Sequence, residues 1–315
     1  MTIAKSARLG RSTKVSVQGV RRRIRRRTPA WGFLVLYLVL LLAFGVAPAL
    51  DGVYQSFLVS SAVGAPSFSL FSNYATVLSD YRMPTAALDV ALYLLVWLPV
   101  LLIVVFGLAL ALDAKRTKFA ALTRFVAYVP GAITGSAAAL LWLFMFSPAV
   151  SPIGPFLKLV STGNSGSFIS DQSLPIVLAV MGIAAGAGGW IVVLYGALTA
   201  IPQEIKESAV LDGASSWQLA RLIKLPLIRG YVVFILVVSI AQGFQVFVEP
   251  AVLANGAPGQ ISQTWSINQL AYSYATDESN YGRAAALSIL LLIVSVALAV
   301  FILKKTNFYT NGDRS

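Results

Sequence analysis

Six long apolar runs constrain this chain more than any other feature of its sequence. Each holds about 20 or more mainly apolar residues with few charges, enough to cross the hydrocarbon core of a bilayer as a helix. Because lipid offers no hydrogen-bond partners, such a run must satisfy its own backbone polar groups, which favours helices. The six predicted spans are residues 31–50, 86–112, 123–147, 173–199, 230–252 and 283–303. The sequence therefore predicts an all-α polytopic membrane protein with six transmembrane helices.

The composition excludes several other classes of protein. Of the 315 residues, 57% are hydrophobic and only 11% are charged, whereas about a quarter of a soluble domain is charged. The chain has no cysteine and no histidine, so disulfides, thiolate or imidazole catalysis and the usual zinc sites are excluded, and we predict no metal site. The net charge of +12 would suggest nucleic acid in a soluble protein, but these charges lie between the apolar runs.

The basic residues orient the spans. Four segments hold 21 of the 24 lysines and arginines: residues 1–30, 113–124, 201–229 and 304–315. By the positive-inside rule these segments, and with them both termini, are expected in the cytoplasm. The remaining three basic residues, Arg82, Lys158 and Arg283, fall in or at the edge of the opposite-side segments.

Three regions follow from this pattern. Residues 1–30 form a basic cytoplasmic arm, expected to be disordered or to lie on lipid headgroups rather than to bind nucleic acid. Residues 31–50 are too long for the apolar core of a typical signal peptide, so they are expected to remain as a first span. The transmembrane domain covers residues 31–305, and residues 306–315 form a cytoplasmic tail.

The polar segment 201–230, IPQEIKESAVLDGASSWQLARLIKLPLIRG, separates predicted spans four and five. Its local signals predict two short helices joined by a tight turn. Pro202 suits the start of the first helix, and Gly213 can adopt the left-handed conformation that ends it. Ser215 and Gln218 have the spacing of a capping box, which would start the second helix.

This hairpin resembles the EAA loop in permease subunits of binding-protein-dependent ABC importers. That pattern is E-A-A-x-x-x-G, then nine residues, then I-x-L-P, and the one departure here is Ser208 in place of the first alanine. The matching positions, with their neighbours, are Glu207, Ser208, Ala209, Asp212, Gly213, Ala214, Ile223, Leu225 and Pro226.

Weaker matches extend the resemblance to the carbohydrate, maltose-type branch of these permeases, over roughly residues 31–305. They comprise Phe71-Ser72-Asn73-Tyr74 with Asp80, Phe244-Gln245-Val246-Phe247 with Glu249-Pro250 and then Asn255-Gly256-Ala257-Pro258, and Tyr281-Gly282-Arg283 with the residues that follow.

The resemblance implies a transport subunit, not an enzyme. It would translocate a disaccharide, oligosaccharide or related carbohydrate from an extracytoplasmic solute-binding protein across a bacterial or archaeal cytoplasmic membrane by alternating access. The implied partners are a second permease subunit and two ABC ATPase subunits. The chain has no G-x-x-x-x-G-K-[ST] motif, so ATP and Mg²⁺ are expected on the ATPases and no cofactor on this chain.

The hairpin residues take specific roles by the same resemblance. Glu207 would offer a carboxylate to a basic group of the ATPase, Gly213 would make the turn, and Ala209 with Ala214 would allow close approach. Ile223, Leu225 and Pro226 would join the second helix to span five.

The solute is less constrained than the driving mechanism. A polyamine, phosphate or glycerol-phosphate permease remains open, as do a secondary transporter and a membrane-embedded enzyme. Which sugar is carried, and whether this subunit or the second permease holds the transient site, also stays open.

A sugar site would combine aromatic platforms with amide or hydroxyl partners. The candidate pathway residues are Trp190, Tyr195, Gln242, Phe244, Gln245, Phe247 and Glu249. Asp89 is expected to be an interface residue, and Glu249 either an interface residue as well or a group that lines the pathway or pairs with Arg283. The glycines Gly182, Gly186, Gly188 and Gly189 are expected mainly to let helices pack closely.

Overall fold

A computed structural model of the chain describes residues 28–60, 66–114, 118–160 and 168–306. The predicted arm and tail therefore fall almost wholly outside the described residues. The chain divides into two units, Met1–Asp51 and Gly52–Ser315. The described part is mainly helical, and its two short strands, β1 (Leu58–Val59) and β2 (Ser67–Phe68), pair antiparallel.

The first unit carries one apolar helix that runs on into the second. It consists of α1 (Thr28–Leu41), the π-helical turn η2 (Leu42–Val46) and α2 (Ala47–Ser56). The stretch Leu34–Ser56 is long and apolar enough to cross a membrane. The wide π turn precedes Pro48, which cannot donate to the carbonyl four residues back and would collide with it in a regular helix.

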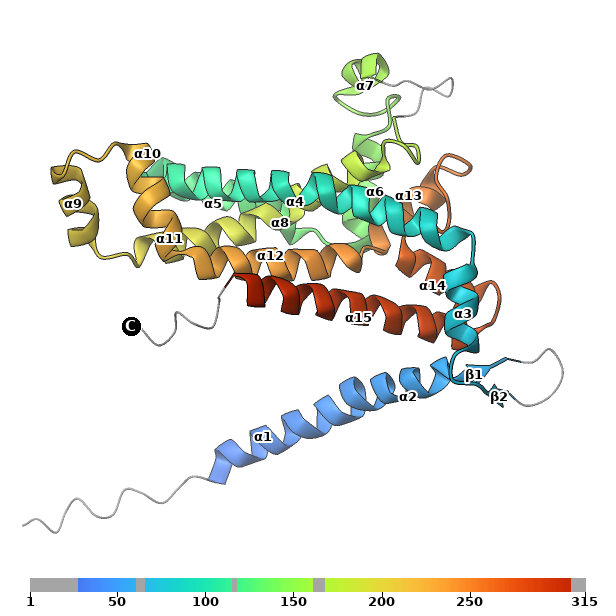
Figure 1. Cartoon of the computed structure of the whole chain (residues 1–315). Helices are drawn as coiled ribbons and strands as arrows, with labels where there is room; N and C mark the ends of the chain where they lie inside the picture. The colour runs from blue at the N-terminus through green and yellow to red at the C-terminus, as the bar shows by residue number, and fades with distance from the viewer. Residues whose placement is uncertain (1–27, 61–65, 115–117, 161–167, 307–315) are drawn as a thin grey trace, which may run out of the picture. The chain divides into compact units, whose positions relative to one another are not determined.

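Long apolar helices dominate the second unit (Figure 1). They are α4 (Arg82–Ala114), α8 (Leu174–Thr199), α12 (Arg229–Phe244) with α13 (Val248–Gly256), and α15 (Tyr281–Lys305). Together with the helix of the first unit, five helices in the described part are long and apolar enough to span a membrane. The described part is therefore mainly helical, and several of its helices are suited to spanning a membrane.

The third predicted span is not one straight helix. It consists of α5 (Lys118–Tyr128), the 3-10 turn η3 (Val129–Ala132) and α6 (Gly135–Met145), with a bend of 103° between its two arms. Pro130 lies in the turn, and Gly135 has φ +64°, a conformation that favours glycine. The described part thus has five spans, or up to six if the bent pair counts as one.

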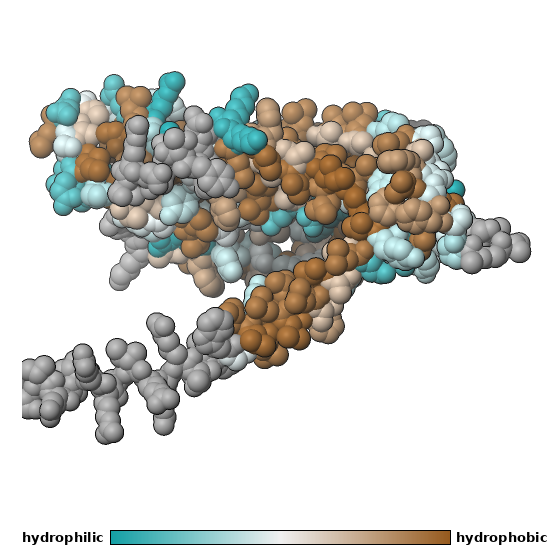
Figure 2. All heavy atoms as spheres, turned by 60° about the horizontal axis from the view of Figure 1, so that its bottom comes forward, coloured by the Kyte–Doolittle hydropathy of each residue, from teal (hydrophilic) through white to brown (hydrophobic). Residues whose placement is uncertain are grey.

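The core of the second unit lies between α4 and α8. Buried side chains on α4 recur every three or four residues, which places them on one face of the helix: Val90, Tyr93, Trp97, Leu101, Val105 and Ala109. Leu95 and Ile103 on the other face are exposed. Figure 2 shows a mainly apolar surface along the long helices, with hydrophilic residues gathered toward their ends. Such a surface suits contact with lipid.

Short helices lie at the two ends of this helical body (Figure 1). At one end, α9 (Gln203–Leu211), α10 (Ser216–Gln218), the π-helical η4 (Leu219–Lys224) and α11 (Leu225–Leu227) connect α8 to α12. At the opposite end lie α3 (Ser72–Ser79) and α14 (Ile267–Thr276), both packed on α15. A further short helix, α7 (Gly154–Val160), follows α6.

Candidate functional site

The hairpin between α8 and α12 has the local structure that its sequence predicts. The first helix ends at Gly213, whose φ of +81° is the left-handed conformation expected there. Ser215 and Gln218 form a complete capping box, which confirms that prediction. The second helix widens into the π-helical η4 before Pro226, again because proline removes one backbone donor.

The residues matched to the EAA pattern divide into exposed and buried positions. Glu207, Ser208 and Asp212 are exposed, whereas Ala209 is buried and its carbonyl accepts a hydrogen bond from the backbone N–H of Ala214 at 3.0 Å. Pro226 and Leu225 are also exposed, and Ile223 is half-buried. The turn therefore presents a polar edge with a carboxylate on the first helix.

A groove of about 1010 Å³ separates the hairpin from the end of α4. We call it the hairpin groove. Exposed apolar side chains on the hairpin, Leu211 and Trp217, line it beside the carboxylate of Glu207. Its wall also carries charged side chains that are buried, namely Asp113, Lys206 and Lys224.

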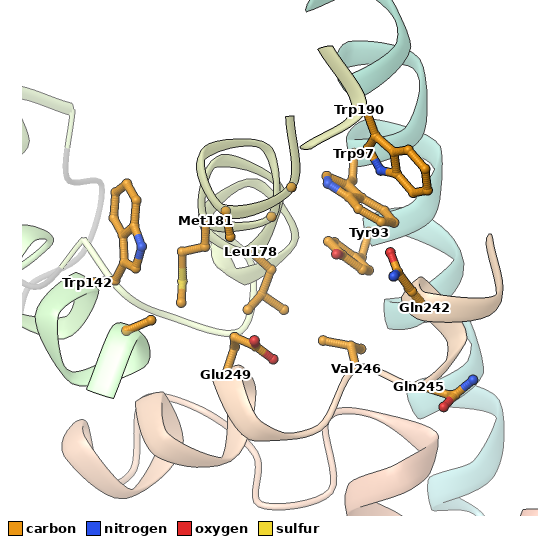
Figure 3. A pocket seen from close by; sticks show the side chains of 14 residues that line it. Tyr93, Trp97, Trp142, Leu178, Met181, Trp190, Gln242, Gln245, Val246 and Glu249 are labelled. Carbon is orange, nitrogen blue, oxygen red and sulfur yellow. The ribbon is translucent and has the colours of Figure 1, made fainter. Parts of the chain in front are cut away.

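A second cavity, the central pocket, lies among α4, α6, α8, α12 and α13 and encloses about 400 Å³ (Figure 3). Tyr93 and Trp97 form one wall as a stacked pair with ring centroids 5.3 Å apart. Polar groups enter from the last turn of α12 and from the residues that follow it. Its lining is Tyr93, Trp97, Ala138, Trp142, Leu178, Met181, Gly182, Ala185, Gly186, Trp190, Gln242, Gln245, Val246 and Glu249.

Four of the seven predicted pathway residues line this pocket: Trp190, Gln242, Gln245 and Glu249. In Figure 3 the carboxylate of Glu249 and the amide of Gln242 face the space between the aromatic rings. The other three, Tyr195, Phe244 and Phe247, do not line it.

Phe244, Phe247 and Tyr195 are used elsewhere. Phe247 packs on Tyr272 with ring centroids 5.3 Å apart, and Phe244 contacts the hydrophobic core. The ring of Tyr195 lies under the guanidinium of Arg124, 4.0 Å from its centroid, which is a cation–π contact between α8 and α5. These three aromatic side chains therefore hold helices together rather than line the pocket.

Some glycines of α8 allow close helix packing, as expected, and some line the central pocket. A Cβ on Gly182 would lie 2.7 Å from the indole Nε1 of Trp97, and a Cβ on Gly188 would collide with the backbone at Ala127 and Tyr128. Both positions thus need glycine for close packing. Gly186 and Gly189 have no atom that near, and Gly186 lines the central pocket.

At the end of the body opposite the hairpin, two of the carbohydrate-branch motifs come together, the one around Asn73 and the one around Gly282. Asn73 is buried and its Nδ2 donates to the carbonyls of Ser56 at 2.9 Å and Leu58 at 2.8 Å. A Cβ on Gly282 would collide with that same Leu58 carbonyl, so α15 approaches β1 closely only through glycine. The hydroxyl of Tyr74 lies 2.8 Å from Ser56 Oγ.

Asp80 is the hub of a neighbouring ionic network. Its carboxylate accepts hydrogen bonds from the Arg82 guanidinium, the shortest at 2.8 Å, and from the Tyr274 hydroxyl at 2.6 Å. Hydrogen bonds from Arg82 hold the pKa of Asp80 well below its usual range. Arg82 also pairs with Glu278, which pairs in turn with Arg283 at 3.2 Å.

This network bears on the pair with Arg283 that was one of the possibilities for Glu249. Arg283 pairs with Glu278, so the alternative pair between Arg283 and Glu249 does not form. Glu249 instead lines the central pocket. Asp89 is half-buried on α4 and does not line that pocket.

Comparison with known proteins gives consistent results. No family model matches the chain. It is 27% identical over 270 residues to the probable starch degradation products transport system permease protein AmyD of Thermoanaerobacterium thermosulfurigenes, covering 85% of this chain and 91% of that protein. It is also 27% identical to the multiple sugar-binding transport system permease protein MsmF of Streptococcus mutans, covering 90% and 97%. The resemblance to sugar permeases of ABC transporters is confirmed.

The fold agrees with that resemblance. A bacterial alginate ABC transporter, solved in complex with an alginate pentasaccharide-bound periplasmic protein, has a chain that matches this permease with a TM-score of 0.73. The match has 20% identity and covers 89% of this chain and 95% of that chain. Like the permease proteins it resembles in sequence, this chain is an integral membrane transport protein and not an enzyme.

Part of each site was not predicted from the sequence. Tyr93, Trp97 and Trp142 line the central pocket, but aromatic residues inside uniformly apolar runs do not reveal which face they occupy. Asp113 follows directly on the apolar run 86–112 and could have been predicted as a site residue, because a carboxylate there requires a partner. The capping box of Ser266 and Gln269 likewise marks α14, which was not predicted.

Proposed function

We propose that this chain is the transmembrane permease subunit of an ATP-driven ABC importer that moves a disaccharide or oligosaccharide from a solute-binding protein into the cytoplasm by alternating access. The observation that carries the proposal is the central pocket, in which aromatic faces and amide groups meet inside a bundle of apolar helices. A sugar offers hydroxyl groups to amides and C–H faces to aromatic rings.

The hairpin is the part of the chain on which the ATPase acts. Glu207, on the exposed edge, pairs with a basic group of a cytoplasmic ATPase subunit, and the exposed Leu211 and Trp217 add apolar contact area. Closure of the ATPase pair moves the hairpin, which continues directly into α8 and α12. Both helices reach the central pocket, through Trp190 and Gln242, so its access changes as they move.

The complete importer contains a second permease, two ATPase subunits and an extracytoplasmic binding protein. In this proposal the chain has six spans, and the positive-inside rule puts both termini and the hairpin in the cytoplasm of a bacterial or archaeal cell. Because the natural chain has no cysteine, single cysteines report the side of the membrane directly. A membrane-impermeant thiol reagent added to intact cells should label Tyr81→Cys and leave Glu204→Cys unlabelled until the membrane is opened.

The charge of the pocket separates the solute classes. Glu249 brings a carboxylate that would repel phosphate or glycerol-phosphate, whereas a neutral sugar could donate hydroxyl groups to it. The same carboxylate would suit a polyamine, which is the second candidate solute. Glu249→Gln keeps hydrogen-bonding capacity and removes the charge, so it should weaken polyamine uptake strongly and sugar uptake little.

The test is uptake of labelled maltodextrins, polyamines and glycerol-phosphate by cells that carry the whole importer. We expect ATP-dependent uptake of an oligosaccharide, with Gln242→Leu raising the KM by about tenfold because an amide partner for the sugar hydroxyls is lost. Phe247→Leu, whose side chain packs outside the pocket on Tyr272, is the control and should keep the KM. Uptake of only a charged solute would overturn the sugar assignment.

A further inference from the structure

Asp113 lies in the last turn of α4, at a buried position where a charged side chain is unusual. Only 2% of its side chain is exposed, and a carboxylate taken out of water needs close partners of opposite charge. Lys224 of η4 provides one, with Nζ 2.7 Å from Oδ2. Lys206 of α9 provides the other, with Nζ 3.8 Å from Oδ1. The two lysines come from the two arms of the hairpin, so one carboxylate holds both.

Lys206 also reaches a third element. Its Nζ donates a hydrogen bond of 2.9 Å to the backbone carbonyl of Leu198, in the last turn of α8. Carbonyls at the end of a helix lack partners within the helix and carry partial negative charge, so an ammonium group suits this position. The ends of α4 and α8 are thus fastened to both arms of the hairpin by a cluster of three charged side chains, which we call the Asp113 cluster.

The cluster is under-bonded on one side. Oδ1 of Asp113 is buried and accepts no hydrogen bond, because Lys206 stays 3.8 Å away. Charged hydrogen bonds of this kind are about 2.8 Å long, so a shift of α9 toward α4 by about 1 Å would complete the contact. The geometry therefore responds to small movements of the hairpin relative to α4.

Helix α4 leads from this cluster to the central pocket. It is continuous from Arg82 to Ala114, and Asp113 follows Trp97 by 16 residues, or about 24 Å at the rise of an α-helix. Trp97 and Tyr93 form the aromatic wall of the pocket on this same helix. One continuous helix, with Pro99 inside it, therefore joins the charged end beside the hairpin to the aromatic wall.

We propose that Asp113 is a positioning residue for transport: through Lys206 and Lys224 it fixes the hairpin to α4, so that hairpin movement reaches the central pocket along α4 as well as along α8 and α12. This inference rests on the proposed function. It adds a third helix to the two that are connected to the hairpin through the chain itself.

The alternative is that the Asp113 cluster only stabilises the fold. A buried ion pair often adds little net stability, while loss of one partner leaves a buried charge uncompensated. A purely structural cluster would lower the amount of assembled importer and would change uptake and ATP hydrolysis in proportion. A positioning role would lower the number of sugar molecules moved per ATP hydrolysed.

The experiment uses the whole importer in proteoliposomes, with binding protein and maltodextrin in one compartment and ATP in the other. For Asp113→Asn we expect assembly and hydrolysis to persist while uptake per ATP falls by about tenfold, within the usual range of coupling between sites. Lys224→Met should do the same. The exchange Asp113→Lys with Lys224→Asp restores the ion pair and should recover much of the ratio. Asp89→Asn, a half-buried carboxylate on the same helix away from the cluster, is the control.

Each result has a distinct meaning. An unchanged ratio in Asp113→Asn, or equal losses of uptake, hydrolysis and assembled complex, overturns the positioning role and leaves the proposed function intact. If Asp113→Asn does not assemble, the neutral pair Asp113→Asn with Lys224→Met leaves a less unbalanced cluster, and a wild-type ratio in that pair overturns the role equally. Absence of ATP-driven uptake in the unaltered importer would instead overturn the proposed function.

Discussion

Asp80 and Asp113 lie near opposite ends of α4, and their surroundings differ in a way that matches the two ends' proposed tasks. Asp80, with 13% of its side chain exposed, accepts hydrogen bonds from the backbone and guanidinium of Arg82 and from Tyr274. Asp113 is 2% exposed, contacts Lys224 closely, and has one oxygen without a hydrogen bond. The first carboxylate is fully bonded and the second is not.

The difference shows how similar charges can serve different purposes. The carboxylate of Asp80, with all its hydrogen bonds made, resists displacement and holds α3, α4 and α14 in one arrangement. A buried carboxylate between two lysines, one of them too far for a hydrogen bond, is sensitive to movement of the elements that carry those lysines. We therefore expect the Asp80 end to matter for local order and the hairpin end to matter for transport.

The largest effect is expected at the turn of the hairpin. Gly213→Val places a β-branched side chain at φ +81°, which such residues do not adopt, so the turn must rearrange and ATP-driven uptake should be lost. Gly213→Asn is the matched control, because asparagine tolerates this conformation, and it should retain most uptake. Uptake is measured at equal amounts of protein in the membrane, and equal losses in both variants would contradict the backbone explanation.

The second effect compares the two carboxylates directly. Asp113→Ala leaves two buried lysines without their counter-charge and should lower the free energy of unfolding by about 3–5 kcal/mol. Asp80→Ala removes hydrogen bonds at a more open site and should lower it by about 1–3 kcal/mol. Denaturant titration of the detergent-solubilised protein measures both. A larger loss for Asp80→Ala would reverse the comparison.

A third prediction tests how closely α8 packs against the end of α5. Gly188→Ala forces a Cβ against the backbone at Ala127 and Tyr128 and should lower the free energy of unfolding by about 1–3 kcal/mol. Its neighbour Gly189 has open space at the same point, so Gly189→Ala should be neutral or stabilise the helix slightly. Thermal unfolding of the two variants decides the point, and equal midpoints would show that the close approach does not matter.

The smallest effect is a dependence on pH at the Asp80 end. The pKa of Asp80 lies below its ordinary value of about 3.9, so its ionised form stabilises the folded state above that pH and loses this contribution as the pH falls through the lower value. The stability difference between the natural chain and Asp80→Asn should thus stay constant from neutral pH to about pH 5 and shrink below about pH 4. A difference that grows in acid would contradict this assignment.

The hairpin was the part of the structure that could best be predicted from the sequence, because its signals are local. Glycine after a helix and Ser215 with Gln218 at capping-box spacing act within a few residues, and the structure contains both features. Residues 306–315 and the basic arm cannot be compared, since nearly all of them lie outside the described residues.

The pocket was only partly predictable, because it depends on which faces of apolar helices meet. Gln242 and Glu249 could be named since polar groups in an apolar run need a reason, and both line the pocket. Phe247 and Tyr195 were named on chemistry alone and pack elsewhere. The turn at Pro130 packs against α8, a contact that no local pattern in the span reveals.

On the proposed function, this chain moves a sugar only when an ATPase acts on its hairpin. The most direct measurement is uptake of labelled maltodextrin by proteoliposomes that contain the complete importer, with and without ATP and with Gly213→Val beside the natural chain. We predict ATP-dependent uptake that the variant abolishes at equal assembly. Equal uptake without ATP, or by Gly213→Val, would contradict the account.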